Sequence, residues 1–341
     1  MNVYGNYQNI GTREEQQDSF GWSKLDDDEF IGHGGKLSII CDGMGGLQNG
    51  REASLSAIQA FRDAYMSKGT AESIPDALHR AVQYTNEQVL ALAKRIGQEG
   101  NCGSTLVAAV LHKDCLYWIS VGDSHIYLWR GSKLQLLNKE HIYANTLDKA
   151  VREGILSEED ASMNPDREAL TSYIGIPELK EIDSGSMNGI PPGAGVVLCS
   201  DGLYKVLSDT EMSRVFDPDA QKWAENLISA TLKKGKAHQD NITVTVLLRE
   251  GAKKRRKPEF FFIAMGSVLL LLAGVLFVLN RPTVPIIPEP ILVISGDDTN
   301  HADPIPSTLS DDPVKNNIED TDEKPYIERI EPLPDLIKEE E

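Results

Sequence analysis

The sequence predicts an α+β fold with antiparallel sheets and helices on the outside, and three observations support it. Short apolar runs rich in β-branched residues are bounded by Gly, Asp or Asn, as is typical of buried strands. A few other segments show apolar residues at helical spacing. The order is strands, two helices, a run of strands, a helical insert and further strands, which lacks the regular alternation of a parallel α/β sheet.

The expected strands and helices all lie in the first 250 residues. The strands are Leu37–Cys41, Thr105–Leu111, Cys115–Val121, Ile126–Arg130, Val196–Ser200 and Thr243–Leu248. The helices are Ala53–Tyr65, Pro75–Ile96 and Trp223–Leu232. Ser73 is expected to cap the second helix, with Pro75 in its first turn.

Charge and cysteine content exclude several classes of protein. The chain of 341 residues has a formal net charge of −18, so it lacks the clustered positive charge of a general nucleic-acid binder, and no nucleic-acid partner is expected. Cys41, Cys102, Cys115 and Cys199 match neither a disulfide framework nor a zinc spacing. We interpret all four as buried small hydrophobes in a reducing compartment.

Residues 260–280 are expected to form a single transmembrane helix. Phe260–Leu279 is an uncharged run of 20 residues, long enough to cross the hydrocarbon of a bilayer. A buried core helix is the alternative, but disorder-like sequence flanks the run. Five basic residues precede it, against Arg281 alone on the other flank. The positive-inside rule therefore predicts a cell-membrane protein with a cytoplasmic head and an external tail; a nuclear-localisation or nucleic-acid patch is the competing interpretation.

The expected organisation has four parts. These are a head at 1–250, a basic juxtamembrane linker at 251–259, the span at 260–280 and a tail at 281–341. The tail holds 16 acidic and 5 basic residues and is rich in proline, so we expect it to be disordered. Nothing in its sequence identifies a partner.

Five aspartates of the head stand beside expected strands or near the ends of the head. Asp42, Asp123 and Asp201 follow apolar runs, whereas Asp18 and Asp240 lie near its two ends. One such Asp is usually a turn former or a helix cap, but five from distant parts of the chain indicate a shared role. Since no His or Cys cluster accompanies them, an all-oxygen Mg²⁺ or Mn²⁺ site is predicted.

Short motifs follow one another through the head in a fixed order. They are Gly11–Arg13 with Gln17–Ser19, Asp42–Gly46, Gly103–Thr105, Val121–Ser124, Leu170–Thr171 with Gly175, Leu198–Leu203 and Asp240–Thr243. This ordered set, which covers residues 1–250, resembles the metal-dependent protein serine/threonine phosphatases of the PP2C (PPM) family, bacterial branch. The resemblance implies an αββα sandwich, in which two antiparallel sheets pack together with helices outside.

The resemblance also implies two divalent ions, Mn²⁺ or Mg²⁺. Asp42 is expected to bridge them, the Gly43 carbonyl to bind one of them, and Asp18 to serve the second ion. A glycine turn favours such a carbonyl ligand because the backbone can approach closely, although a flexible turn is the plainer interpretation of the glycines alone. The catalytic residues implied are Arg13, Asp18 and Asp42.

Further roles follow from the same resemblance. Asp201 and Asp240 complete the ligands of the first ion, and Asp123 with Asp201 holds a third, weaker ion. Arg13 corresponds to the phosphate-binding arginine. The expected reaction is hydrolysis of phosphoserine and phosphothreonine in proteins by a hydroxide that bridges two metals, while the ions and Arg13 neutralise the phosphoryl charge.

The sequence departs from the family pattern at Glu140–Ile142 and Leu170–Gly175. Residues 141–175 occupy the mobile flap of the family, so these changes affect substrate preference rather than metal chemistry. His141 is either a proton donor to the leaving oxygen or, the favoured interpretation, a local structural residue.

Two other functions compete with that of an active enzyme. The expected partners of an active enzyme are phosphoproteins and a membrane-anchored Ser/Thr kinase that it counteracts. A catalytically weak phosphatase-like sensor or scaffold would lack a metal aspartate, whereas all five aspartates are present. A receptor whose tail senses an external signal and gates the head is compatible with activity.

Overall fold

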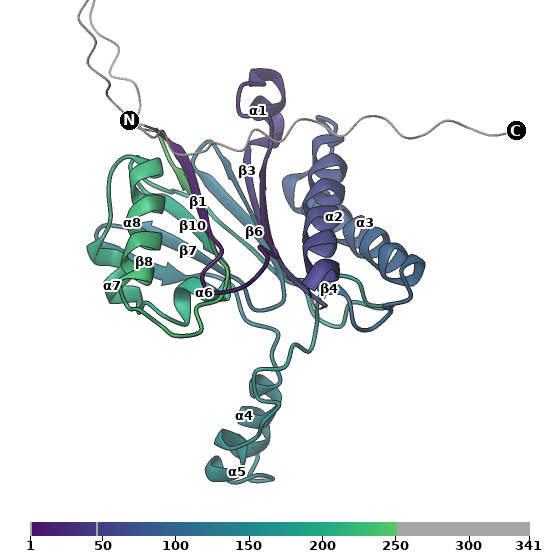
Figure 1. Cartoon of the computed structure of the whole chain (residues 1–341). Coiled ribbons are helices and arrows are strands. Elements are labelled where there is room, and N and C mark those ends of the chain that lie inside the picture. Colours follow the sequence, from purple (N-terminus) through teal and green to yellow (C-terminus); the bar gives the residue numbers. More distant parts are fainter. Residues whose placement is uncertain (1, 46, 251–341) are drawn as a thin grey trace, which may run out of the picture. The chain divides into compact units, whose positions relative to one another are not determined.

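The computed structural model describes residues 2–45 and 47–250. Two antiparallel sheets pack face to face, and helices cover their outer faces (Figure 1). The expected α+β class and αββα order of layers are confirmed. The linker, span and tail expected at 251–341 lie outside the described residues. Within the described ranges, no helix has the length and apolar character needed to cross a bilayer.

Each sheet combines strands from distant parts of the chain. The first sheet has the order β1 (Tyr4–Asn9), β11 (Ile242–Leu248), β10 (Gly195–Cys199), β7 (His125–Arg130) and β8 (Lys133–Leu136). The second has the order β2 (Asp18–Trp22), β3 (Lys36–Met44), β5 (Leu106–His112), β6 (Cys115–Val121) and β9 (Asp183–Met187), and β4 (Gly103–Ser104) pairs with β3.

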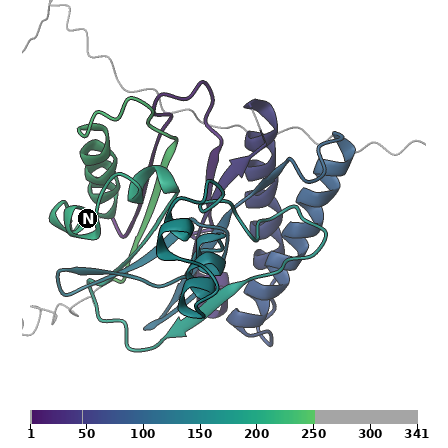
Figure 2. The same cartoon turned by 90° about the horizontal axis from the view of Figure 1, so that it is seen from below.

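The helices form the two outer layers and a projecting flap. Helices α2 (Leu47–Met66) and α3 (Ile74–Arg95) cover the second sheet, while α6 (Asp201–Tyr204), α7 (Asp209–Arg214) and α8 (Ala220–Leu232) lie on the side of the first. The short helix α1 (Asp28–Gly34) precedes β3, and α4 (Ala144–Arg152) and α5 (Glu158–Ser162) belong to the flap. Figure 2 shows the layers from the flap side.

Apolar residues on both faces of the strands explain why the two sheets form the inner layers of the sandwich. Along β3, Leu37, Ile39 and Cys41 pack in the core beneath α2 and α3, whereas Ile40 packs in the core between the sheets. Sheets covered on both faces require nearly continuous apolar runs, and these runs predicted the strands. The inner layer also contains a buried hydrogen bond from Ser38 Oγ to Thr245 Oγ1 at 2.7 Å.

The cap predicted for α3 is present, but one cysteine differs from expectation. Ser73 Oγ accepts a hydrogen bond from Asp76 N, and Pro75 lies in the first turn. All four cysteines are free, and Cys41, Cys102 and Cys199 are buried. The expectation that Cys115 is also buried is wrong: it is partly exposed because it begins β6 directly after a turn.

Candidate active site

Two of the predicted aspartates face each other where the two sheets meet. Asp18, the first residue of β2, pairs in register with Asp42 of β3. Asp42 therefore lies within a strand rather than after one, because β3 runs on to Met44. Ser200, which follows β10 of the other sheet, donates a hydrogen bond from Oγ to Asp18 Oδ2 at 2.7 Å. The contact ties the ends of both sheets together at this point.

Asp123 and Asp201 come together because β7 and β10 are neighbouring antiparallel strands, so that the start of β7 lies beside the end of β10. Cys199 at the end of β10 is in register with His125 at the start of β7. Asp201 is the first residue of α6, and Asp123 lies in the turn before β7. The ammonium of Lys205 contacts both carboxylates, at 2.8 Å from Asp201 Oδ2 and 3.6 Å from Asp123 Oδ2.

Asp240 lies just before β11 and pairs with Arg13. The distance from the Arg13 guanidinium to Asp240 Oδ2 is 2.7 Å. The loop that contains Arg13 is held beside Asp240, because Thr12 N donates a hydrogen bond to Gln239 O at 2.9 Å. The Arg13 side chain is 60% exposed, so its guanidinium is accessible to a phosphoryl group.

The electrostatics of the site show that the carboxylates act on one another. Burial, together with the negative charge of Asp201, raises the pKa of Asp18 to about 7, against the hydrogen bond from Ser200. Burial raises the pKa of Asp42 well above its usual range, and the charges of Asp18, Asp201, Asp123 and Asp240 raise it further. Carboxylates in this arrangement favour either protons or a cation.

The chemistry of the donors fits a divalent cation at Asp18 and Asp42. Asp18 Oδ1 is buried and has no hydrogen-bond partner among the residues that the structure describes. Carboxylate and carbonyl oxygens are the donors that Mg²⁺ and Mn²⁺ prefer. At Gly43 an added Cβ would lie 1.9 Å from the Gly50 carbonyl oxygen, so only glycine allows this backbone position.

Other carboxylates of the site are held in ion pairs. Among residues 2–45 and 47–250, no three His, Cys, Asp or Glu side chains already meet the geometry of a metal site. Arg13 pairs with Asp240, and Lys205 pairs with Asp201 and Asp123. A third ion at Asp123 and Asp201 fits poorly, because the ammonium lies against both carboxylates.

Three residues that the sequence analysis did not identify complete this part of the site. Besides Lys205, they are Tyr204 and His125, whose rings stack with centroids 3.6 Å apart. Tyr204 OH donates to Asp123 Oδ2 at 3.4 Å, and His125 Nε2 lies 2.7 Å from Glu140 Oε1. The spacing of four residues between Asp201 and Lys205 was the one available signal.

His141 supports the turn that contains Asp123. Its side chain is buried, and its Nδ1 accepts a hydrogen bond from Gly122 N at 3.0 Å. The backbone adds a bond from His141 N to Gly122 O at 2.9 Å. These contacts support a local structural role rather than proton donation.

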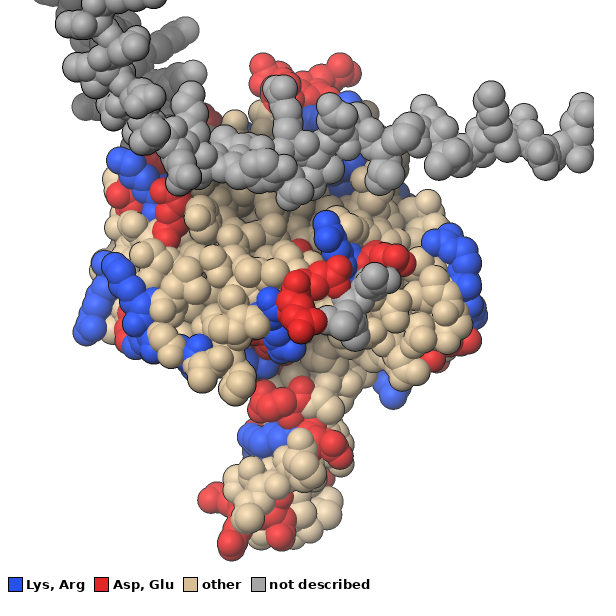
Figure 3. Space-filling model, viewed as in Figure 1, with Lys and Arg blue, Asp and Glu red and all other residues tan. Residues whose placement is uncertain are grey.

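The flap rises from the edge of the sandwich that carries the aspartates. Its root is fastened by bridges between Ile142 and Leu170 and between Ser104 and Ile174. Residues 141–175 hold seven acidic and three basic side chains. Figure 3 shows several groups of acidic side chains on the projecting flap, among other residues. The flap therefore presents negative charge beside the site.

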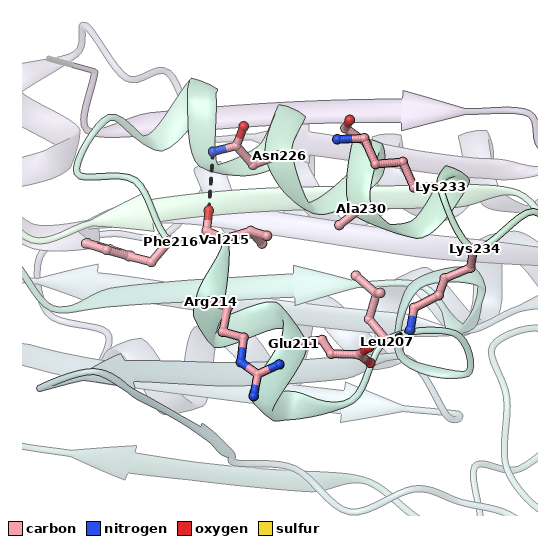
Figure 4. Close-up of a pocket in the computed structure, with 10 residues that line it drawn as sticks. Leu207, Glu211, Arg214, Val215, Phe216, Asn226, Ala230, Lys233 and Lys234 are labelled. Atoms are coloured by element: carbon pink, nitrogen blue, oxygen red, sulfur yellow. Dashed lines mark hydrogen bonds and ion pairs between the residues drawn. The ribbon is translucent and has the colours of Figure 1, made fainter.

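The larger pockets described below lie outside the aspartate cluster. A pocket of about 560 Å³ between α7 and α8 (Figure 4) is lined by Leu207, Glu211, Arg214, Val215, Phe216, Asn226, Ser229, Ala230, Lys233 and Lys234. It contains none of the predicted site residues. Another of about 780 Å³ includes Glu140 and His141 at the root of the flap, with Asp148 and Arg152 of α4.

Solved structures share this fold. The serine/threonine phosphatase of S. agalactiae is 26% identical, with a TM-score of 0.62 over 72% of this chain and 99% of that chain. PstP of Mycobacterium tuberculosis is 26% identical, with a TM-score of 0.60 over 73% of this chain and 98% of that chain. The PstP catalytic domain was also solved in complex with two manganese ions, at a TM-score of 0.58 and 26% identity. The fold and the site thus define a protein phosphatase.

Sequence comparison gives the family. Residues 7–238 match the family model described as protein phosphatase 2C. The serine/threonine phosphatase stp of Listeria welshimeri is 30% identical over 223 residues, which cover 64% of this chain and 87% of that protein. The phosphatase PhpP of Streptococcus pneumoniae is 26% identical over 235 residues, 67% of this chain and 93% of that protein. The chain belongs to the protein phosphatase 2C family.

Proposed function

We propose that this protein phosphatase hydrolyses phosphoserine and phosphothreonine in proteins, using two divalent ions, Mn²⁺ or Mg²⁺. The observation that carries the proposal is the pairing of Asp18 with Asp42, close enough to Asp201 and Asp240 for their negative charges to act on Asp42. The two manganese ions of the PstP catalytic domain and the names of the bacterial relatives support it.

The residues of the chain divide the work of this reaction. When bound, the two cations supply an acidified water and neutralise charge on the phosphoryl group. Asp18, Asp42, Asp201, Asp240 and the Gly43 carbonyl would hold them. Ser200 keeps Asp18 in position through its 2.7 Å hydrogen bond.

Arg13 binds the phosphoryl oxygens in this proposal. A planar guanidinium offers two parallel donors and matches a phosphoryl group better than an ammonium does. Arg13 is exposed and contacts a single exposed carboxylate, Asp240. An exposed ion pair is worth at most about 1 kcal/mol, so a substrate phosphate displaces it at low cost.

Hydrolysis of p-nitrophenyl phosphate and of phosphoserine and phosphothreonine peptides tests this function. The full-length chain should be active with Mn²⁺ and inactive after chelation with EDTA. Asp42→Asn should remove activity, whereas Asp63→Asn on the exposed side of α2 should not. Equal rates for the wild type and Asp42→Asn, or no response to Mn²⁺, would refute the proposal.

We also propose that residues 260–280 anchor the phosphatase in the cell membrane, with residues 1–250 in the cytoplasm. The uncharged run and the five basic residues before it support this topology. Protease treatment of intact cells should remove the tail at 281–341 and leave the head intact. Cleavage of the head would exclude this orientation.

A Ser/Thr kinase of the same membrane is the proposed counterpart of the enzyme. The reaction requires a Ser/Thr kinase to supply phosphorylated substrates, and the proposed membrane anchor favours a kinase of the same membrane. Deletion of the phosphatase should raise phosphorylation of the targets of that kinase, and phosphoproteomics measures the change. An unchanged phosphoproteome would exclude the pairing.

A further inference from the structure

Lys205 lies between two of the predicted ligand carboxylates and has no part in the reaction proposed above. Its Nζ is 2.8 Å from Asp201 Oδ2 and 3.6 Å from Asp123 Oδ2. The Asp201 and Asp123 side chains are only 19% and 13% exposed. Carboxylates this far from water require a nearby cation or hydrogen-bond donors to remain ionised.

The local fold fixes the ammonium in this position. Lys205 N donates to Asp201 O at 3.1 Å, which closes a helical turn. Side chains four residues apart in such a turn share one face, and an acidic residue before a lysine is the favourable order. Asp123 is held from another side, because Tyr204 OH donates to its Oδ2 at 3.4 Å.

Lys205 carries a positive charge at neutral pH, because the ordinary pKa of a lysine lies about three units higher. That charge faces the carboxylates of both Asp201 and Asp123. A divalent ion bound by the same two carboxylates has to displace the ammonium and is repelled by it while it stays. The pair formed by Arg13 and Asp240 differs, since it involves one carboxylate and both side chains are well exposed.

We propose that Lys205 is a built-in cation that takes the place of a third divalent ion, so that this phosphatase works with two bound ions. The inference rests on the proposed function. It predicts that Asp123, which the resemblance assigns to a third ion, is neutralised by the chain itself and binds no metal.

Counting bound Mn²⁺ on the full-length protein tests the inference without measuring activity. The protein is dialysed against millimolar Mn²⁺, and free ion is quantified by electron paramagnetic resonance. We expect two ions on the wild type, three on Lys205→Ala and two on Lys205→Arg. The double variant Lys205→Ala/Asp123→Asn should return to two. Lys233→Ala, at a lysine that lines the separate pocket between α7 and α8 (Figure 4), is the matched control and should keep two.

The outcomes separate this inference from the proposed function. Three ions on the wild type, or two on a folded Lys205→Ala chain, would overturn the role of Lys205 and leave the two-ion phosphatase intact. A wild type that binds no Mn²⁺ would overturn the proposed function and the inference with it. If Lys205→Ala does not fold, Asp123→Asn alone decides: an unchanged two ions supports the inference, and a lost ion overturns it.

Discussion

Asp18 and Asp42 lie opposite each other across the antiparallel pair of β2 and β3. Their carboxylates are close enough for the charge of Asp18 to raise the pKa of Asp42, and Asp18 is buried while Asp42 is half-buried. A pair of this kind is poorly stable when fully ionised, because two like charges lie close together and are largely removed from water. Its proton content therefore couples metal binding to the stability of the fold.

The metal-free protein should become less stable as the pH rises toward neutrality. Asp18 has a folded pKa of about 7, well above its ordinary value of 3.8, so the folded state keeps a proton that the unfolded chain has released. The stabilisation that Asp18 gives to the folded state is fully present below about pH 4, and it is lost as the pH rises through about 7. Thermal unfolding in EDTA between pH 5 and 8 measures the trend. Asp18→Asn should flatten it, and saturating Mn²⁺ should reverse it; a metal-free wild type with the same slope as Asp18→Asn would contradict the assignment.

Replacing Gly43 by alanine should destabilise the protein by several kcal/mol and weaken metal binding. The new Cβ would lie 1.9 Å from the Gly50 carbonyl oxygen and 2.9 Å from that of Gln17, so backbone has to move. We expect the melting temperature to fall by about 10 °C for a domain of this size. Gly69→Ala is the control, because a Cβ there meets nothing within 4 Å. Equal melting temperatures for the two variants would show that the end of β3 tolerates a side chain at position 43.

Substitution of Arg13 should reduce turnover while leaving the fold unchanged. Loss of a positioned phosphate donor costs about 10²-fold in kcat/KM, as for other groups that stabilise transition-state charge. Arg13→Ala should show this loss, and Arg13→Lys should recover part of it, because an ammonium keeps the charge but not the paired donors. Steady-state kinetics on a phosphothreonine peptide gives the values. Wild-type kinetics for Arg13→Ala would show that Arg13 does not bind the phosphoryl group.

His141 should make the protein sensitive to acid. Burial lowers its pKa below 6.5, so the folded state holds it neutral while the unfolded chain accepts a proton. Its stabilising effect is present above about pH 6.5 and is lost as the pH falls through the lowered folded value. Protonation of Nδ1 would also break the hydrogen bond from Gly122 N. His141→Asn keeps an acceptor and does not titrate, so its melting temperature should fall less between pH 7 and 5; parallel curves would contradict this role.

The acidic flap should favour substrates with basic residues beside the phosphorylated side chain. Residues 141–175 carry seven acidic and three basic side chains, and attraction of this kind acts mainly on association and weakens with salt. Glu158→Lys/Glu159→Lys on α5 should lower kcat/KM for a lysine-flanked phosphopeptide several-fold, with little effect on p-nitrophenyl phosphate. If both substrates respond equally, the flap acts on the site itself rather than on peptide recognition.

The sequence predicted those elements best whose signals lie within the element itself, such as a continuous apolar run or a helix cap. Continuous apolar runs predicted β3, β5, β6, β7, β10 and β11, and Ser73 with Pro75 marked the start of α3. The strand β9 was missed, because DSGSM contains no large apolar residue except Met187 and pairs with β6 at the edge of the sheet. The strand β1 was missed for a similar reason, since its exposed edge carries polar residues.

The aspartates of the site were identified from sequence, but the cations that contact them were not all identified. Asp18, Asp42, Asp123, Asp201 and Asp240 stand out because charged residues rarely adjoin buried strands. Lys205 carries no such signal: a lysine on a short helix is ordinarily a solvated residue. Only the pairing of β7 with β10 brings Asp123 to Asp201 and so gives Lys205 a second carboxylate.

The position of β11 has a consequence for biosynthesis. This strand is the last of the described elements, yet it lies between β1 and β10, and Asp240 lies two residues before it. A nascent chain on the ribosome therefore holds β1 and β10 with unsatisfied edges until residue 248 has emerged. The domain cannot mature from its amino terminus onward, and during synthesis those open edges are the surfaces that a chaperone has to shield.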